Sequence, residues 1–194
     1  MTDYFVEGGD TLENKFGILD PTELRETEEF YFSEAASDII VNSEKLEVFD
    51  FDFLKKLHKK LFGEVYDFAG KIRTVNITKT DSDIPFCFAD FIETEADRIF
   101  KDLASKNYFR GYSLSDSSEA LAKLSAELNA LHPFREGNGR TIRLFLQLLA
   151  RENGFILDYS LASHDEIIMA DKAVFLGDSN LIEKLYKKIL SEIK

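Results

Sequence analysis

Residues 131–143 read L-H-P-F-R-E-G-N-G-R-T-I-R, and this stretch decides how the rest of the chain is interpreted. It combines one imidazole, one carboxylate, two glycines and several arginines. Folded chains rarely place so many polar and conformationally free residues together without a function. The combination predicts a site that handles phosphate groups.

The glycines predict an anion-binding turn. Gly137, Asn138 and Gly139 lie directly before a segment with helical periodicity. Glycine allows backbone conformations in which successive N–H groups point into one concavity. The N-terminus of the following helix adds a favourable dipole, so we expect phosphate oxygens at this turn.

The charged side chains around the turn predict the chemistry. Arg140 and Arg143 share one face of the predicted helix, so both can hold a phosphate chain by forked hydrogen bonds. Glu136 would repel phosphate unless a cation lies between them, and Mg²⁺ bound by one carboxylate and phosphate oxygens is a common arrangement. His132 is then the candidate general base, because a free imidazole has a pKa of about 6.5 and is largely neutral at pH 7.

Each of these residues, taken singly, also fits a structural role. A histidine near a helix end is more often structural than catalytic, a G-N-G sequence is often only a turn, and arginines in an acidic chain often pair with carboxylates. The combination is what favours a functional site. His58 and His164 have no such combination of residues around them in the sequence, so we assign them structural roles.

Composition limits the class of protein. The 194 residues include 24 basic and 36 acidic side chains, a net charge of −12, and 44% are hydrophobic, which is typical of one globular domain with its own core. The negative charge disfavours nucleic acid and anionic membranes as partners. The N-terminal sequence lacks a signal-peptide pattern, and no apolar stretch approaches the ~20 residues that span a bilayer, so we expect a soluble, cytoplasmic protein. The single cysteine, Cys87, is interpreted as a small apolar residue.

The chain is predicted to be largely helical. Residues 1–19 are expected to form an N-terminal arm packed on the core, and residues 20–194 to form one domain. Asp20 and Pro21 give a strong helix start. Apolar residues at helical spacing predict further helices over about 51–61, 90–105, 117–131, 139–153, 163–176 and 180–193. The segment 139–153 is apolar on most faces, so its helix is expected to be central.

The segment 71–89 has a different pattern. Residues 73–78 are β-branched and alternating, residues 80–83 are typical of a turn, and residues 84–88 are again extended. This pattern predicts a β-hairpin. Its second strand contains Pro85 and should therefore lie at an edge.

The sequence H-P-F-R-E-G-N-G-R, from His132 to Arg140, resembles the complete Fic-domain motif H-P-F-x-[D/E]-G-N-G-R, and Arg143 extends the match. The similarity to compact toxin-type (class I) bacterial Fic proteins covers most of the chain, because residues 14–21, 61–78 and 126–131 also match. The resemblance implies an all-α Fic fold, a helical bundle with a β-hairpin flap over the active site.

The resemblance also implies a Mg²⁺-dependent protein adenylyltransferase, which transfers AMP from ATP to a Tyr, Ser or Thr hydroxyl of a target protein. The implied roles are proton acceptor for His132, Mg²⁺ ligand for Glu136, phosphate ligands for Gly137, Asn138 and Gly139, and ligands of the β- and γ-phosphates for Arg140 and Arg143.

The flap is expected to bind the target. By resemblance, the first strand, Val75, Asn76, Ile77 and Thr78, would pair with an extended segment of the target protein. A hairpin that merely covers the site is the alternative. Residues 79–84 replace the shorter, glycine-containing turn that is common in the family. Because the turn departs from the family pattern, the resemblance does not determine which target this chain binds.

Two other activities stay open. A Fic-like phosphotransferase of the Doc type binds the nucleotide in reverse and transfers its γ-phosphate. Members of that type carry Lys where this chain has Gly139, so the glycine favours transfer of AMP or of another nucleotidyl group. A non-catalytic nucleotide-binding module is disfavoured by the intact His132 and Glu136.

Regulation follows from Arg143. Many Fic proteins are inhibited by a helix with the pattern [S/T]-x-x-x-E-[G/N], whose Glu pairs with the second motif arginine. Residues 179–184 and 22–27 match the spacing but lack the final Gly or Asn. We therefore expect a separate small antitoxin protein to supply the inhibitory Glu, with inhibition in cis through Glu183, or no inhibition, as the alternatives. The toxin-type resemblance suggests type II topoisomerase subunits as targets.

Overall fold

Seven α-helices and one small sheet make up the regular structure of residues 4–7, 9–42, 48–78 and 85–193, the parts of the chain that the computed structural model describes. The α-helices are α1 (Pro21–Asn42), α2 (Phe51–Phe62), α3 (Ile92–Ser105), α4 (Leu114–Leu131), α5 (Asn138–Glu152), α6 (His164–Phe175) and α7 (Asn180–Ile189). Short 3₁₀ turns lie at Ala89–Phe91, Asn107–Phe109 and Tyr159–Leu161. The predicted all-α fold class is confirmed.

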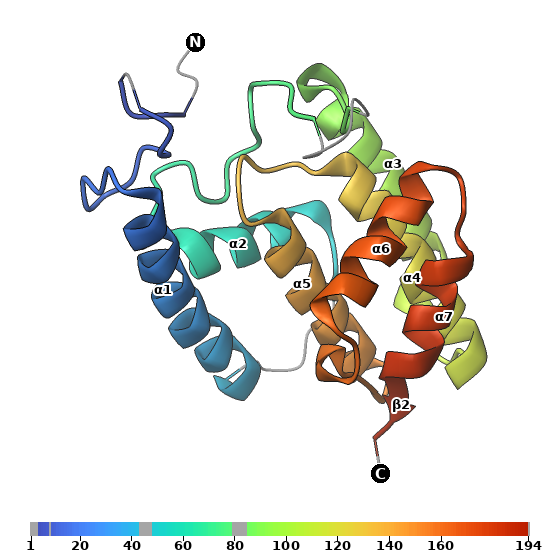
Figure 1. The fold of residues 1–194 in the computed structure, drawn as a ribbon. Helices are drawn as coiled ribbons and strands as arrows, with labels where there is room; N and C mark the ends of the chain where they lie inside the picture. The colour runs from blue at the N-terminus through green and yellow to red at the C-terminus, as the bar shows by residue number, and fades with distance from the viewer. Residues whose placement is uncertain (1–3, 8, 43–47, 79–84, 194) are drawn as a thin grey trace.

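Helix α5 lies at the centre of the bundle, as its sequence predicts. It packs against α2 on one side and against α4 on the other (Figure 1). Its buried side chains surround the helix: Asn138, Thr141, Ile142, Leu144, Phe145, Leu146, Leu148, Leu149 and Ala150. Burial of a large apolar side chain contributes roughly 1.5–3 kcal/mol. This burial fixes the N-terminal end of α5, where the motif lies.

Four of the α-helices begin at a residue whose side chain caps them. The caps are Asp20 for α1, Asp50 for α2, Ser113 for α4 and Ser163, in a capping box with Glu166, for α6. Each side-chain oxygen accepts a backbone N–H that the first helical turn leaves without a partner. Because Ser113 caps α4, that helix begins at Leu114, earlier than the predicted residue 117.

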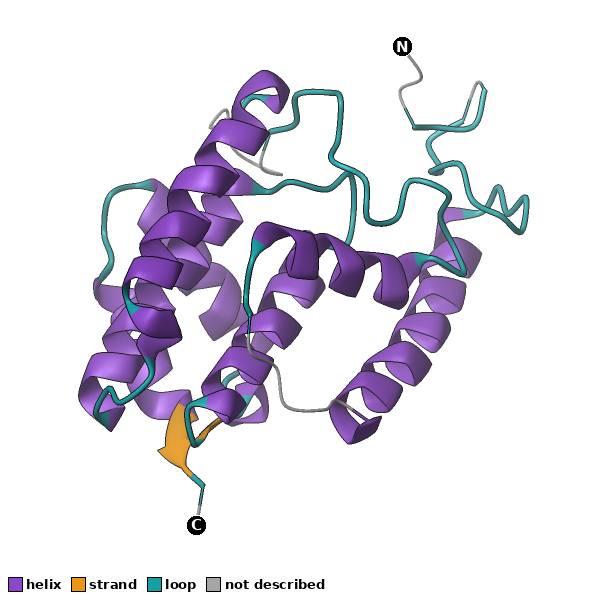
Figure 2. Cartoon of the chain, turned by 180° about the vertical axis from the view of Figure 1, so that it is seen from behind, coloured by secondary structure: helices purple, strands orange, loops and turns teal. Residues whose placement is uncertain are grey.

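The C-terminal prediction is wrong in one respect. The last helix ends at Ile189, and β2 (Leu190–Glu192) pairs with β1 (Phe155–Leu157) in an antiparallel sheet with Leu157 opposite Leu190 (Figure 2). From its sequence the last helix is expected to continue to residue 193, and no strand is expected at residues 155–157. Strands of three residues are too short to show periodicity, and burial of Leu157 and Leu190 favours the extended pairing.

The predicted hairpin is present only as two extended limbs. Within the described residues, the limbs 73–78 and 85–88 share one isolated bridge, Thr78 to Pro85, and one backbone hydrogen bond, from Phe86 N to Ile77 O at 3.2 Å. The predicted turn at 79–84 lies outside the described residues. The described residues of the two limbs form no longer ladder, and two of their backbone groups, Arg73 N and Cys87 N, bind carbonyl oxygens at the end of α4 instead.

The N-terminal segment contacts the loop after α2. Lys15 N donates to Val65 O at 2.9 Å, and the Tyr4 and Phe68 rings meet edge to face with centroids 5.3 Å apart. The Asn14 side chain closes the turn that leads into α1, because its Oδ1 accepts Ile18 N at 3.0 Å and its Nδ2 donates to Ile18 O at 2.8 Å. The domain boundary at residue 20 stays a prediction.

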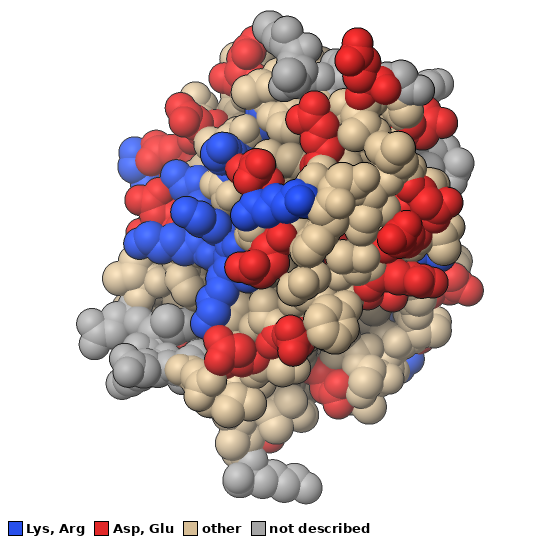
Figure 3. Space-filling model, turned by 90° about the vertical axis from the view of Figure 1, so that its left-hand side faces the viewer, with Lys and Arg blue, Asp and Glu red and all other residues tan. Residues whose placement is uncertain are grey.

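The surface is dominated by acidic side chains. On the face shown in Figure 3, Asp and Glu are spread widely while Lys and Arg gather in one region. None of the helices in the described parts of the chain combines the length and the apolar character that a membrane span needs.

Candidate active site

His132 lies at the point where the chain leaves α4. It is the C-cap residue of that helix, with a left-handed backbone (φ 45°, ψ 60°). Its ring stacks on Phe86, with centroids 3.7 Å apart. Its Nδ1 lies 3.3 Å from Asn129 O, and a carbonyl oxygen can only accept, so Nδ1 carries a proton. In the neutral ring the lone pair is therefore on Nε2.

Asn138 closes the loop between α4 and α5. Its Oδ1 accepts Phe134 N at 2.9 Å, its Nδ2 donates to Phe134 O at 2.8 Å, and the residue is 2% exposed. The side chain is therefore used inside the loop. A contact from Asn138 to phosphate would have to come from its backbone N–H, which is one of the amides that the first turn of α5 leaves without a helical acceptor.

His58 supports the same loop from α2. Its Nδ1 accepts Gly70 N at 2.8 Å, so its Nε2 carries the proton and donates to Glu136 O at 2.9 Å. Burial lowers the pKa of His58 to about 4, which keeps the ring neutral at pH 7. The structural role predicted for His58 is confirmed. Its buried ring holds the motif loop by the hydrogen bond to Glu136 O.

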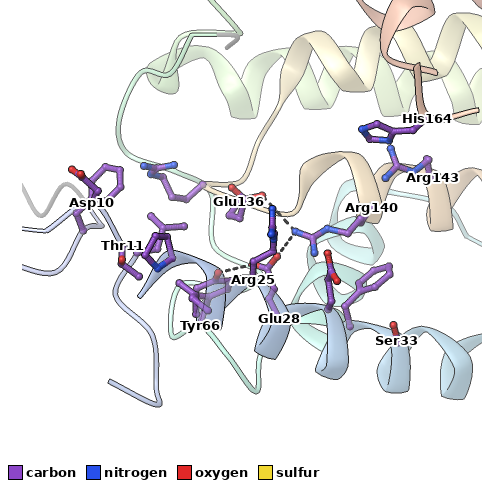
Figure 4. A pocket seen from close by; sticks show the side chains of 17 residues that line it. Asp10, Thr11, Arg25, Glu28, Ser33, Tyr66, Glu136, Arg140, Arg143 and His164 are labelled. Atoms are coloured by element: carbon purple, nitrogen blue, oxygen red, sulfur yellow. Dashed lines mark hydrogen bonds and ion pairs between the residues drawn. The ribbon is translucent and has the colours of Figure 1, made fainter. Parts of the chain in front are cut away.

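A cleft of about 820 Å³ opens beside the N-terminus of α5 (Figure 4). Its described lining residues come from the N-terminal arm, α1, the loop after α2, the motif with the first turns of α5, and α6. They include four arginines, Arg25, Arg135, Arg140 and Arg143, and four carboxylates, Asp10, Glu28, Glu29 and Glu136. The lining thus has as many arginines as carboxylates in a chain with a net charge of −12, and its guanidinium groups can bind an anionic ligand.

Arg140 is held in the cleft by a carboxylate of α1. Glu28 Oε1 lies 2.5 Å from Arg140 Nη2, and Tyr66 donates to Glu28 Oε2 at 2.5 Å. The Glu28 side chain is only 7% exposed. Burial, followed by the hydrogen bond to Glu28, raises the pKa of Tyr66 well above its ordinary value. Arg140 also lies over the Phe62 ring, 4.8 Å from its centroid, so its guanidinium is oriented before any ligand binds.

Arg143 lies one helical turn further along α5. A Cβ added to Gly139 would lie 3.2 Å from Arg143 Nη1, so this guanidinium folds back over the first turn of the helix. His164, the first residue of α6, lies beside Arg143 at the cleft (Figure 4). The purely structural role predicted for His164 is therefore incomplete, because this residue lines the cleft.

Glu136 fits a metal site of one carboxylate. Its side chain is 44% exposed and lines the cleft, and its Oε1 accepts Gly137 N at 2.8 Å. Among the described residues, no three His, Cys, Asp or Glu side chains are grouped to hold an ion. Mg²⁺ often uses one protein carboxylate together with phosphate oxygens and water. The residues present thus fit an ion that binds together with a nucleotide.

The structure brings the predicted residues to two sides of one loop. Glu136, Arg140 and Arg143 line the cleft, whereas His132 lies under the limbs of the predicted flap. The limb residues Val75, Asn76, Ile77 and Thr78 use part of their polar groups internally, for example Asn76 Oδ1, which accepts Ala89 N at 2.8 Å.

Sequence reasoning missed Glu28, Tyr66 and Arg25. One signal was present for Glu28. It follows Leu24 by one helical turn, so it occupies the buried face of α1 where an apolar residue is expected. Tyr66 and Arg25 have no comparable signal, because only the packing of α1 against the motif shows where their side chains lie.

The chain is similar to known proteins over nearly its whole length. The sequence profile of the Fic/DOC family matches residues 48–150. Protein adenylyltransferase VbhT of Bartonella schoenbuchensis is 43% identical over 144 residues, which are 74% of this chain but 30% of VbhT. Protein y4lH of Sinorhizobium fredii, named a probable protein adenylyltransferase, is 36% identical over 88% of this chain and 86% of its own length.

Two solved structures with bound adenine nucleotides share the fold. BepC of Bartonella tribocorum, with bound AMPPNP, has a TM-score of 0.93 at 27% identity and covers 98% of this chain and 97% of its own. The N-terminal Fic domain of a VirB-translocated Bep effector protein of Bartonella quintana, with bound ADP, has a TM-score of 0.94 at 26% identity and covers 98% and 95%.

We predict that Gly137→Ala and Gly139→Ala differ sharply in stability. Gly137 has φ +74°, and an added Cβ would lie 2.5 Å from the buried ring of Phe62. Strain and overpacking should lower the free energy of unfolding by roughly 2–4 kcal/mol. At Gly139 the nearest atom is the flexible end of Arg143, so the change should be within about 1 kcal/mol. Urea unfolding measures both, and equal losses would contradict this account.

We also predict that His58 destabilises the fold in acid. Its pKa is about 4 in the folded chain against 6.5 as a free group, so its contribution to stability is complete above pH 6.5 and is lost as the pH falls toward 4. The free energy of unfolding should fall by up to about 3 kcal/mol across this window. In His58→Gln this part of the pH dependence should disappear, while it should persist in the control His164→Gln, an exposed position. Identical pH profiles for wild type and His58→Gln would refute the assignment.

Proposed function

Because this chain belongs to the Fic/DOC family, we propose that it is a protein adenylyltransferase that moves AMP from ATP to a hydroxyl group of a target protein. The observation that carries the proposal is the arrangement around one short loop, where an imidazole lies on one side and a cleft with four arginines on the other. Relatives named as adenylyltransferases and neighbours with bound AMPPNP and ADP support the same activity.

His132 acts as the general base in this proposal. The contact of Nδ1 with Asn129 O leaves Nε2 as the atom that takes the proton from the target hydroxyl. The hydroxyl oxygen then forms a bond to the α-phosphorus, the bond between that phosphorus and the bridging oxygen breaks, and pyrophosphate leaves in line with the attack.

The cleft binds the phosphates in this proposal. We expect the backbone amides of Gly137, Asn138 and Gly139, at the start of α5, to bind phosphate oxygens. Arg140 and Arg143, which line the cleft, would hold the β- and γ-phosphates. Glu136 would bind Mg²⁺, which when bound neutralises charge between the phosphates. Because Glu28 already orients Arg140, little conformational entropy is lost when this guanidinium meets its ligand.

One observation favours AMP transfer over γ-phosphate transfer of the Doc type. Arg143 folds back over Gly139, and its Nη1 would be 3.2 Å from an added Cβ. A lysine side chain at this position would compete with Arg143 for the same space. Gly139 therefore keeps the second arginine available for the terminal phosphate.

We propose that the limbs 73–78 and 85–88 bind the target. A free extended edge can pair with an extended peptide through main-chain hydrogen bonds, which would place a Tyr, Ser or Thr hydroxyl near His132. Type II topoisomerase subunits are the targets suggested by resemblance to toxin-type relatives.

Because ATP is the substrate in this proposal, we place the reaction in a cytoplasm.

We further propose control by a small antitoxin protein whose Glu binds Arg143. The cis alternative has less support, because Glu183 accepts a hydrogen bond from Ser179 Oγ at 3.0 Å on α7. Neither residue is among the described residues that line the cleft.

ATP labelled at either the α- or the γ-phosphate tests the activity. With Mg²⁺ and a bacterial lysate, we expect protein labelling from the α-position, and His132→Ala should reduce it by roughly 10²–10⁴-fold. The variant should keep its affinity for ATP, because His132 is not among the described residues that line the cleft. Labelling from the γ-position alone would rule out AMP transfer in favour of phosphotransfer.

Arg143→Ala tests the mode of control. The probe is a small protein containing S-x-x-x-E-G, to be sought among the products of the neighbouring reading frames. We expect Arg143→Ala to weaken its inhibition of residual transfer by at least about tenfold, since a charge-assisted hydrogen bond contributes about 1.5–3 kcal/mol. Arg151→Ala, at an arginine on the far end of α5, should leave inhibition unchanged. Equal inhibition of wild type and Arg143→Ala would contradict the proposal.

A further inference from the structure

The end of α4 presents a concentration of hydrogen-bond acceptors. The last carbonyl groups of a helix have no intrahelical donor. Here the chain turns left-handed at His132, and the following residue, Pro133, has no N–H to offer. The carbonyl oxygens of residues 130–133 must therefore find donors elsewhere, or their desolvation would cost roughly 1–3 kcal/mol each.

The two limbs 73–78 and 85–88 supply donors to all four of these carbonyl groups. The hydrogen bonds are Cys87 N to Ala130 O at 3.0 Å, Arg73 Nη2 to Leu131 O at 3.5 Å, Arg73 Nε to His132 O at 2.8 Å, and Arg73 N to Pro133 O at 2.9 Å. Three of the four come from one residue, Arg73.

Arg73 also joins the two limbs to each other. Its Nη1 donates to Val75 O at 2.7 Å in the first limb, and its Nη2 donates to Cys87 O in the second. The residue is 1% exposed, and each hydrogen bond that its guanidinium makes among the described residues ends on a carbonyl oxygen. Burial lowers the pKa of Arg73, although an arginine stays charged in proteins. Among the described residues, the partners of this buried cation are thus carbonyl oxygens.

The second limb completes the contact with the imidazole. Phe86, which is bonded to the first limb through its N–H to Ile77 O at 3.2 Å, stacks on the His132 ring at an interplanar angle of 17°. The backbone of His132 is therefore fixed by Arg73, and its ring by a limb that Arg73 also fixes.

We propose that Arg73 is a positioning residue for the transfer reaction. It holds the His132 imidazole in place and aligns the two limbs with that imidazole. This inference rests on the proposed role of His132 as base. Arg73 is not among the described residues that line the phosphate-binding cleft, so its effect falls on the transfer step and on the target, and not on nucleotide binding.

Arg73→Lys is the informative substitution. Lysine keeps the charge and most of the volume, but its single ammonium group cannot reproduce the planar fork that serves several carbonyl oxygens. The matched control is Arg151→Lys, because Arg151 Nη1 also donates to a backbone carbonyl, Ile40 O at 3.1 Å, at the opposite end of α5.

The first measurement separates binding from transfer. In Arg73→Lys we expect ATP affinity within about threefold of wild type and a transfer rate at saturating ATP lower by on the order of 10²-fold, because a displacement of about 1 Å has that effect. Arg151→Lys should match wild type in both. An equal loss of ATP affinity and rate, or no loss of rate in a folded Arg73→Lys protein, would overturn the proposal.

The second measurement is independent of activity. The chain has three histidines, so the NMR signals of its imidazole rings can be resolved. In Arg73→Lys the His132 signals should move, because the ring leaves its position over Phe86, while those of His58, stacked on Phe134, should not. An unchanged His132 signal would contradict the positioning role. Should wild type transfer no AMP, the proposed function fails while this measurement still tests Arg73.

A third measurement uses wild type alone and covers the case in which Arg73→Lys does not fold. The Nε–H of Arg73 is buried and bonded to His132 O, so its proton should exchange with water at least about 10²-fold more slowly than that of Arg98, which is half-exposed and bonded to Glu95 on the surface. Equal exchange of the two protons would show that the contact with His132 does not persist and would overturn the proposal.

Discussion

Four successive carbonyl oxygens at the end of α4 require donors that the helix cannot provide, and much of the site depends on how this requirement is met. The left-handed turn at His132 and the missing N–H of Pro133 create the requirement. Arg73 and Cys87 meet it from a segment about fifty residues earlier in the chain. The same hydrogen bonds therefore stabilise the helix end, fix the candidate base and bring the limbs of the flap to it.

The other side of the loop is organised by a different kind of contact. Asn138 and His58 bind backbone groups of the turn, from within the turn and from α2, and so fix the backbone from which α5 begins. Glu28 then holds Arg140 in place from α1. A buried ion pair of this kind contributes little net stability, because desolvation offsets the attraction. Its value is geometric, since it keeps a guanidinium oriented toward an anionic ligand.

The cleft side and the His132 side of the loop differ in structure, as the proposed reaction requires. The phosphate side is held in place before a ligand binds, because most of the surface of α5 is buried and the helix packs on α2 and α4. The hydroxyl side is made by two extended limbs that share a single bridge among their described residues. An open edge of this kind can accept different peptide backbones, whereas we propose that the motif binds one class of nucleotide.

Most of the helices, the central place of α5, the candidate phosphate-binding turn and the candidate base can be predicted from the residues in order. These features depend on local spacing, caps and residue chemistry, which are all visible in the linear chain. Three features become visible only in the folded chain: Arg73 anchors the flap, Glu28 and Tyr66 hold Arg140, and residues 190–192 form a strand. In each of these cases the partner atoms lie far apart in sequence, so the interaction depends on packing that no local pattern records.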